Sequence, residues 1–362
     1  MPRGPHLNPH VCHLRALLGL AMVAVVCASA RAARAADPAR PALDPTMTRL
    51  AYADDDWIVW LTFERVPGTE RNVAPSYVRT YRLQRVGEST TRSVLRTRGT
   101  RTHDVVTVLP DGTIGVAYWS TLVWARPDGS DPVEHTREMD VPLVFEGKRF
   151  HVARGYPAGL FVQESAYSNA RPVLFVPLEG TQLDWAKHKQ VTTEPVRVTQ
   201  HPAACLDGDL ACAGGSVFDL ETERRVELGI GEHNAVRALG AGLAASFRSV
   251  VRISDLATVD LPYWHQPFAI RHGVVYSARP THRVGGGAEG SVKVFASSGT
   301  SGGDPTLVAE VRAVGVRTPY AHLDRGQVVS YGPVTITWNR LGIWLFDGNV
   351  WTHHDWLEMP PK

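Results

Sequence analysis

The stretch that decides the fold is VVTVLPDGTIGVAYW, residues 105–119. A run of β-branched and aliphatic residues leads into Pro110, Asp111 and Gly112, which are typical of a tight turn. A second apolar run begins at Ile114. Two short apolar segments separated by such a turn predict a β-hairpin.

Turns of this kind recur along the chain. They lie at residues 54–56, 110–112, 157–159, 207–209, 240–242, 272–273 and 325–326. Seven turns over about 270 residues give one turn per roughly 45 residues, close to the period of about 40–50 residues of a propeller blade. The spacing therefore predicts a series of repeated hairpins.

Between these turns the apolar residues alternate or form short runs rich in Val, Ile, Thr, Tyr, Phe and Trp, which is typical of strands. Residues 235–253 come closest to a helical pattern. Gly240, Gly242 and the β-branched run that begins at Val250 favour strands there as well. We therefore expect an all-β chain.

The repeats share more than their turns. The segments that begin at His201, Gln266 and Thr318 each place a proline and then an alanine at a similar distance before a glycine. Further strand-like segments follow the hairpins, at residues 215–220, 249–256 and 291–295. Many short strands without intervening helices favour a β-propeller of seven blades. The irregular spacing is compatible with six to eight blades, and a pair of β-sandwiches is the structural alternative.

The N-terminus has the order of a secretory signal. Arg3 and Arg15 precede an apolar run from Ala16 to Ala28, and a stretch of small residues ends at Ala36. The apolar run has 13 residues, fewer than the roughly 20 that cross a bilayer. We expect cleavage near Ala35 or Ala36 and export to the periplasm or the exterior, with an uncleaved anchor or a lipoprotein attached at Cys27 as the alternatives.

The expected organisation has four parts. Residues 1–36 are the signal, and residues 37–45, which contain three prolines, form an extended linker. Residues 46–358 are expected to form a single β-propeller domain, and residues 359–362 a tail. The signal contains four arginines and no acidic residue, so the whole chain's formal net charge of +2 becomes slightly negative after cleavage. A nucleic-acid partner then has little electrostatic support.

Two cysteines remain after cleavage, Cys205 and Cys212, because Cys12 and Cys27 belong to the signal. An isolated pair in an oxidising compartment predicts a disulfide. A zinc site is the weaker interpretation, since no second Cys or His pair follows at zinc-like spacing.

Two segments carry a family resemblance. Residues 108–119 resemble the inner hairpins of bacterial exported propellers, including sialidase-like ones. Residues 342–352 resemble the outer hairpin of periplasmic sensor propellers and, more loosely, the Asp-box turn of sialidases. The second match departs from that box, because Leu345 replaces an expected serine and Gly348 follows Asp347 directly. Both motifs stabilise turns, so the resemblance implies a fold before it implies an activity.

The arginines and three short polar runs are the candidates for catalytic or metal sites. A sialidase-like hydrolase would need three converging arginines, a Tyr–Glu pair and an acid/base aspartate, and the arginines are too numerous to choose among. The three aspartates at 54–56 are interpreted as a solvated turn. Residues 207–209 are interpreted as a tight turn in preference to a Ca²⁺ site. The His-His-Asp run at 353–355 is interpreted as a polar strand in preference to a metal site, because adjacent histidines on a strand point to opposite faces. The sequence predicts no metal and no cofactor.

The residues expected to bind a ligand are Tyr263, Trp264 and His265, which join two repeats where a connection crosses the propeller face. Packing between neighbouring blades is the alternative role. We expect a monomeric, non-catalytic exported propeller that binds a small ligand, a surface glycan or an envelope protein partner. The alternatives are a sialidase-like glycoside hydrolase and the sensor module of an envelope complex.

Ring closure gives the last expectation. A circular array leaves its first and last blades unjoined unless one blade takes strands from both chain ends. We expect residues 47–53 to pair with, or lie beside, the blade built from residues 319–356.

Overall fold

A computed structural model describes residues 49–66, 77–99, 105–118, 120–129, 131–165, 171–192, 204–229, 235–262, 265–282, 289–301, 304–316 and 327–357. All of them belong to the second of two units of the chain, Ala42–Lys362. The expected signal, linker and C-terminal tail lie outside the described residues. The described part contains no helix that is long and apolar enough to cross a membrane.

The described strands form seven separate sheets, which we name blades A to G in chain order. Blade A contains β1 (Leu50–Ala53), β2 (Trp57–Arg65), β3 (Tyr77–Arg85) and β4 (Thr91–Gly99). Blade B contains β5 (Val105–Val108), β6 (Ile114–Tyr118), β7 (Thr121–Ala125) and β9 (Val141–Pro142). Blades C and D contain β11 (Lys148–Tyr156), β12 (Gly159–Glu164), β13 (Val173–Glu179) and β15 (Lys189–Gln190), then β16 (Ala204–Asp207), β17 (Leu210–Ala213), β18 (Ser216–Asp219) and β19 (Arg225–Glu227).

The last three blades follow the same plan. They contain β20 (Ala238–Gly240), β21 (Leu243–Ala245), β22 (Ser249–Arg252) and β23 (Thr258–Asp260); β24 (Gln266–Arg271), β25 (Val274–His282), β26 (Glu289–Ser298) and β27 (Thr306–Val314); and β28 (Val328–Tyr331), β29 (Val334–Asn339), β30 (Gly342–Phe346) and β31 (Trp351–His354). Within each blade, consecutive strands pair antiparallel.

Blades A to C carry additional short strands. β8 (Val133–Glu134) pairs in parallel with β4, although it lies in the connection between β7 and β9 of blade B. β10 (Val144–Phe145) and β14 (Gln182–Leu183) extend blade C. The helical residues of the described chain are two single 3₁₀ turns, η1 (Arg137–Met139) and η2 (Trp185–Lys187).

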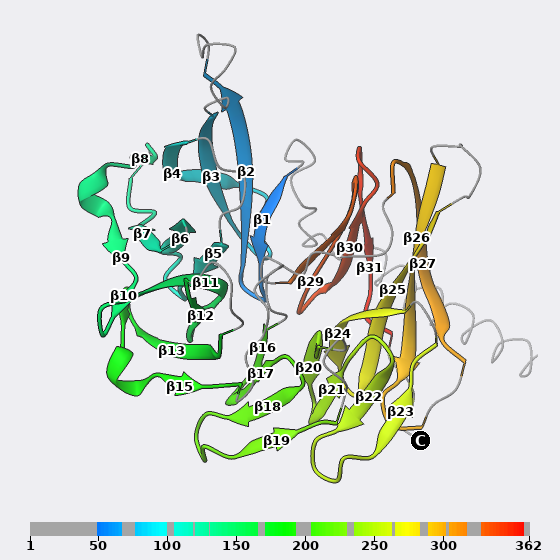
Figure 1. Ribbon diagram of the computed structural model, residues 1–362. Coiled ribbons are helices and arrows are strands. Elements are labelled where there is room, and N and C mark those ends of the chain that lie inside the picture. Colours follow the sequence, from blue (N-terminus) through cyan, green and yellow to red (C-terminus); the bar gives the residue numbers. More distant parts are fainter. Residues whose placement is uncertain are drawn as a thin grey trace, which may run out of the picture. The chain divides into compact units, whose positions relative to one another are not determined.

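The seven blades are arranged in a ring, so the chain forms a seven-bladed β-propeller (Figure 1). This confirms the predicted fold and excludes the pair of β-sandwiches. Six of the seven predicted turns separate the first two strands of blades A to F. The seventh, at residues 325–326, lies outside the described residues, and the corresponding turn of blade G is at Gly332 and Pro333.

The core is divided among the junctions between blades. Among the residues that the structure describes, seven apolar clusters occur, and each combines buried residues of two neighbouring blades, from A–B through to G–A. A blade between two such clusters is apolar on both faces. This is why strands such as VVTV of β5 are buried at every position and read as continuous apolar runs in the sequence.

The G–A junction closes the ring. Leu50, Ile58 and Trp60 of blade A pack with Val328 and Trp344 of blade G. The N–H of Gln327 donates to the carbonyl of Ala53 at 2.8 Å. The prediction that residues 47–53 lie beside the C-terminal blade is therefore confirmed for the described residues 50–53.

The expectation that one blade takes strands from both chain ends is wrong. β1 pairs with β2 as the first strand of blade A, and blade G is complete with β28 to β31. Side-chain packing seals the junction instead, with the ring centroids of Trp60 and Trp351 5.8 Å apart in an edge-to-face pair. Arg340 and Asp56 add a surface ion pair at 3.6 Å.

This closure predicts measurable coupling between Trp60 and Trp351. In a double-mutant cycle of Trp60→Ala and Trp351→Ala, the two losses in the free energy of unfolding should be non-additive by about 0.5–1.5 kcal/mol. Either single substitution already removes the contact between the two rings, so the second substitution cannot remove it again. Urea denaturation measures the cycle. The control pair, Trp60→Ala with Trp124→Ala of the B–C cluster, should be additive. Additivity in both cycles would contradict closure through this contact.

A second prediction concerns the approach of the first strands of blades B and C. A Cβ on Gly155 of β11 would lie 2.6 Å from the Cβ of Thr107 on β5. Gly155→Ala should therefore lower the free energy of unfolding by about 1–3 kcal/mol through overpacking. Gly99→Ala is the matched control, since a Cβ there meets nothing within 4 Å. Equal denaturation midpoints for the two variants would show that the strands separate without cost.

Candidate functional site

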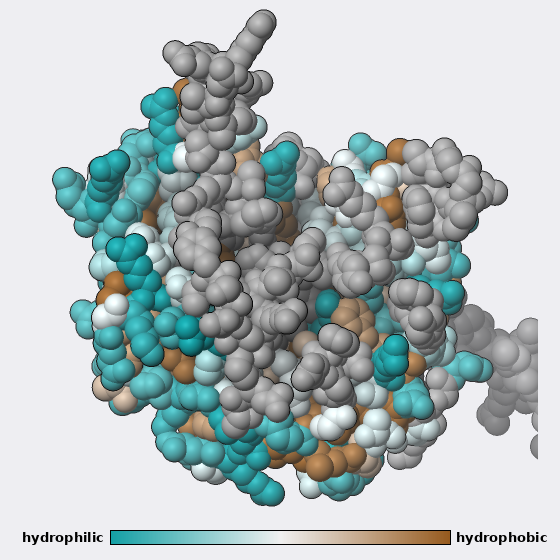
Figure 2. Space-filling view, in the orientation of Figure 1, coloured by the Kyte–Doolittle hydropathy of each residue, from teal (hydrophilic) through white to brown (hydrophobic). Residues whose placement is uncertain are grey.

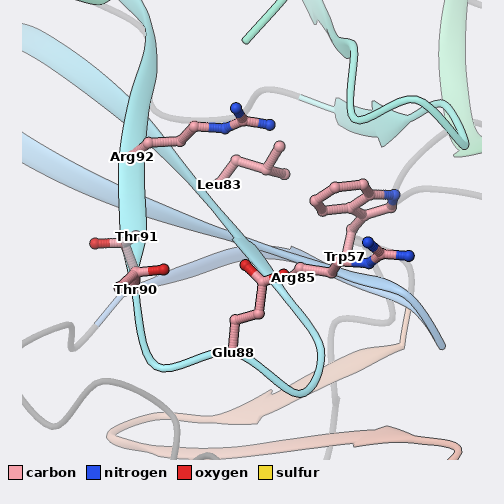
Figure 3. A pocket seen from close by; sticks show the side chains of 7 residues that line it. All are labelled: Trp57, Leu83, Arg85, Glu88, Thr90, Thr91 and Arg92. Carbon is pink, nitrogen blue, oxygen red and sulfur yellow. The ribbon is translucent and has the colours of Figure 1, made fainter. Parts of the chain in front are cut away.

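A pocket opens at the end of blade A where the β1–β2 and β3–β4 turns lie. Its volume is about 360 Å³, within the range of small-ligand sites. Figure 3 shows the Trp57 ring beside Leu83, with Arg92 on one side and Glu88 on the other. The lining residues are Trp57, Leu83, Arg85, Glu88, Thr90, Thr91 and Arg92.

The apolar wall is fixed by the turn that precedes it. The carboxylate of Asp54 accepts hydrogen bonds from the backbone N–H groups of Asp56 and Trp57, at 2.8 and 2.6 Å, and from the hydroxyl of Tyr52 at 2.7 Å. Burial raises the pKa of Asp54. Asp54 thus sets where β2 begins, and it places the indole of Trp57, which is 9% exposed, in the pocket wall.

The aspartate run is a turn, as the sequence predicted, but its side chains are engaged in contacts. Asp55 contacts Arg271 of blade F at 3.2 Å, and Asp56 contacts Arg340 of blade G. The three carboxylates therefore point to different partners, and they do not form the paired-carboxylate arrangement of a general acid and base.

The polar wall is held by the β3–β4 turn. The side-chain amide of Gln84 donates to the carbonyl of Glu88 at 2.7 Å, and the N–H of Val86 donates to the carbonyl of Asp56 at 2.8 Å. Gly87, at φ 106°, allows the chain to reverse here. These bonds fix the backbone on which Arg85, Glu88 and Thr90 are carried.

Segments of blade B pack against the residues that line the pocket. An Nη of Arg92 donates to the carbonyl of Pro127 at 2.9 Å, in the segment that carries β8 back onto blade A. Gly112 of the β5–β6 turn is so close that a Cβ would lie 3.1 Å from both Leu83 and Trp57. All seven lining residues belong to blade A, and blade B lies close to three of them.

The pocket combines an apolar surface with polar and cationic side chains. Trp57 and Leu83 offer an apolar surface, Thr90 and Thr91 offer hydroxyls, and two guanidinium groups stand against one carboxylate. The guanidinium carbon of Arg85 lies 5.8 Å from the centre of the Trp57 ring. Arginine is suited to planar, bidentate contacts with carboxylates.

Of the residues predicted to bind a ligand, the structure describes only His265. It is 2% exposed, its Nδ1 is 3.0 Å from the hydroxyl of Ser277, and its ring centre is 4.6 Å from that of Phe295. Burial and the charge of Arg279 lower the pKa of His265 to about 4. His265 is thus a neutral, packed side chain at the start of β24. Tyr263 and Trp264 lie outside the described residues.

The other sequence candidates are dispersed. Asp207, Gly208 and Asp209 end β16 and form its tight turn to β17. His353 packs on Trp344 with ring centres 4.5 Å apart. No cluster of three or more metal-ligating side chains occurs in the part of the chain that the structure describes. Cys205 and Cys212 are buried free thiols in the structure, so the expected bridge is not formed there.

A second polar group, which the sequence did not indicate, lies where the first strands converge. Arg154 and Tyr156 of blade C both donate to the carbonyl of Ala204 in blade D, at 2.7 and 3.2 Å. Tyr331 of blade G donates to the side chain of Gln266 in blade F at 3.2 Å. These side chains come from strands far apart in the sequence, and their bonds tie neighbouring blades together.

Figure 2 shows the described surface of one face as mostly hydrophilic, with separated apolar areas. The exposed large apolar residues are distributed over several blades: Val141, Val144, Leu256, Leu307, Val314, Leu341, Val350 and Leu357. Single exposed apolar residues of this kind are normal on a folded protein. Among the described residues, the blade A pocket is therefore the candidate binding site that we consider further.

The sequence matches no protein-family profile and shows no significant similarity to a curated protein. Three solved structures illustrate its structural likenesses. A puromycin-hydrolysing peptidase of Mycobacterium tuberculosis is 12% identical with a TM-score of 0.39, over 74% of this chain and 54% of that one, so this chain spans about half its length.

The β-propeller domain of the trilobed protease of Pyrococcus furiosus, described as having an open velcro topology, is 7% identical with a TM-score of 0.45, over 85% of this chain and 97% of that one. A 6-phosphogluconolactonase candidate from Bacteroides uniformis is 10% identical with a TM-score of 0.29, over 84% and 83%. The fold of the present chain rests on its own strand pairing, and these distant likenesses assign it no activity.

Proposed function

We propose that this chain is an exported, non-catalytic β-propeller that binds an anionic ring compound, such as an acidic glycan, in the blade A pocket. The observation that carries the proposal is the pairing of the Trp57–Leu83 wall with Arg85 and Arg92 in one cavity. An aromatic face suits the apolar side of a sugar ring, and guanidinium groups suit its carboxylate or sulfate.

The rigidity of the pocket supports this function. The Trp57 backbone is held by Asp54, and Arg92 is held by the Pro127 carbonyl, so neither group has to be ordered when a ligand enters. Sites whose side chains are already in place lose less entropy on binding. The expected export adds a biological setting, because acidic glycans occur on cell surfaces and outside cells.

The test is a titration of the purified mature protein with a hexuronate trisaccharide and with its carboxyl-reduced, neutral counterpart. We expect only the hexuronate to bind, and Arg92→Gln to raise its Kd by roughly 10–100-fold, because a hydrogen bond to a charged group contributes about 1.5–3 kcal/mol. Isothermal titration calorimetry measures both. Arg98→Gln, an exposed arginine further along β4 and absent from the lining, is the matched control and should leave the Kd unchanged.

If the neutral saccharide bound with the same Kd as the hexuronate, anion recognition would be contradicted. If Arg98→Gln raised the Kd as much as Arg92→Gln, recognition by this pocket would be contradicted. Failure of both saccharides to bind would overturn the proposed function.

The alternative function, a sialidase-like glycoside hydrolase, is favoured by one observation, the hydrogen-bonded Tyr52–Asp54 pair near Arg154 and Tyr156. The tyrosines in this region bond to Asp54, the Ala204 carbonyl and Gln266, and a sialidase-like nucleophile requires a tyrosine paired with glutamate. We expect no turnover of a panel of fluorogenic glycosides. Turnover that disappears in Asp54→Asn, in a variant that remains folded, would establish the hydrolase instead.

A further inference from the structure

The two cysteines face each other across the first hairpin of blade D. The register of β16 and β17 places Cys205 directly opposite Cys212, and Asp207 opposite Leu210, so Gly208 and Asp209 alone form the turn. The side chains are 6% and 0% exposed, and both are free thiols. They belong to the apolar cluster that joins blades D and E.

The type of this cross-strand pair follows from the backbone hydrogen bonds. The N–H of Leu220 donates to the carbonyl of Asp209 at 2.8 Å, so the backbone of Asp209 faces β18. Backbone direction alternates along a strand, and the backbone groups of Leu210 and Cys212 therefore face β16. Cys205 and Cys212 consequently form a hydrogen-bonded pair, the wider of the two antiparallel pair types.

The wider pair does not match the geometry of a relaxed disulfide. Directly opposed residues have Cβ atoms about 4.5–5.5 Å apart, with hydrogen-bonded pairs at the upper end, whereas a disulfide needs about 3.5–4.5 Å. A bond between these cysteines requires the two strands to shift together. Such strained bonds are the more easily reduced ones, which are typical of labile or regulatory disulfides.

The surroundings make the two thiols unequal. The hydrogen bond with Cys212 lowers the pKa of Cys205, burial opposes this shift, and the charges of Arg154 and Arg237 add to it. Burial raises the pKa of Cys212. Cys205 is also the more exposed of the two side chains, at 6% against 0%, so it is the better candidate for the attacking thiolate, with Cys212 beside it as the resolving thiol.

We propose that Cys205 and Cys212 form a reversible redox site, which low-molecular-weight disulfides oxidise and thiols reduce again. The Cys205 thiolate attacks one sulfur of the oxidant, forms a mixed disulfide and releases one thiolate. Cys212 then loses its proton and attacks the Cys205 sulfur, which closes the protein disulfide and releases the second thiolate. The oxidant is reduced to two thiols while the protein loses two hydrogens. Closure joins β16 to β17 covalently at the D–E junction.

The test equilibrates the mature full-length protein in glutathione buffers from fully oxidised to fully reduced, quenches the thiols and measures the bridged fraction by mass spectrometry. We expect the native pair to convert completely in both directions without denaturant. The matched control moves the pair by one register position, to Ala204→Cys and Ala213→Cys in a Cys205→Ala, Cys212→Ala background. That pair is directly opposed and not hydrogen-bonded, so its reduction should require at least about tenfold more glutathione.

A native pair that forms no bridge in the oxidised buffer would overturn the proposal. A native bridge that resists reduction would be a structural disulfide and would also overturn the proposal. A native bridge that is reduced no more easily than the bridge of the moved pair would overturn it as well. If the moved pair does not fold, the decision rests on the native pair, whose bridge must form and then open in glutathione while the protein stays folded by circular dichroism.

Discussion

Packing between neighbouring blades is the interaction on which the other features of this propeller depend. A single four-stranded sheet with two apolar faces cannot bury either face by itself, and each described blade has an apolar cluster on both sides. The ring satisfies this requirement only if it closes, because an open ring would expose one face of blade A and one of blade G. The Trp60, Trp344 and Trp351 rings at the G–A junction meet that requirement by packing, without a strand shared between the two blades.

The same constraint explains where polar groups are tolerated. Near the converging first strands, Arg154, Tyr156 and Tyr331 are positioned by hydrogen bonds to the neighbouring blade, so their burial does not leave hydroxyls without partners. In blade D the strands carry two thiols in the D–E cluster, and the strand register holds them at a separation that favours thiols over a relaxed disulfide. Structural packing and the proposed redox site thus share one hairpin.

The candidate binding site arises where the repeat is least regular. The connection between β7 and β9 leaves blade B, adds β8 to the edge of blade A and returns, and on the way it supplies the Pro127 carbonyl that holds Arg92. Gly112 of blade B also lies close to Trp57 and Leu83. A blade without the irregular connection would lack the hydrogen bond between Arg92 and the Pro127 carbonyl.

The sequence by itself determined the all-β class, a repeat of six to eight hairpin units and most of the hairpin turns, because strand propensity, apolar runs and turn residues are local properties that each repeat expresses again. The tertiary structure decided what depends on contacts between distant residues. Closure without a shared strand, the burial of His265 and the hydrogen bond that holds Arg92 near Trp57 each require partners at least 12 residues away in the chain. The cysteine pair shows this division between sequence and tertiary structure. The sequence predicted that Cys205 and Cys212 lie close together, but only the strand register and its hydrogen bonds decided that they form the wider, hydrogen-bonded type of cross-strand pair.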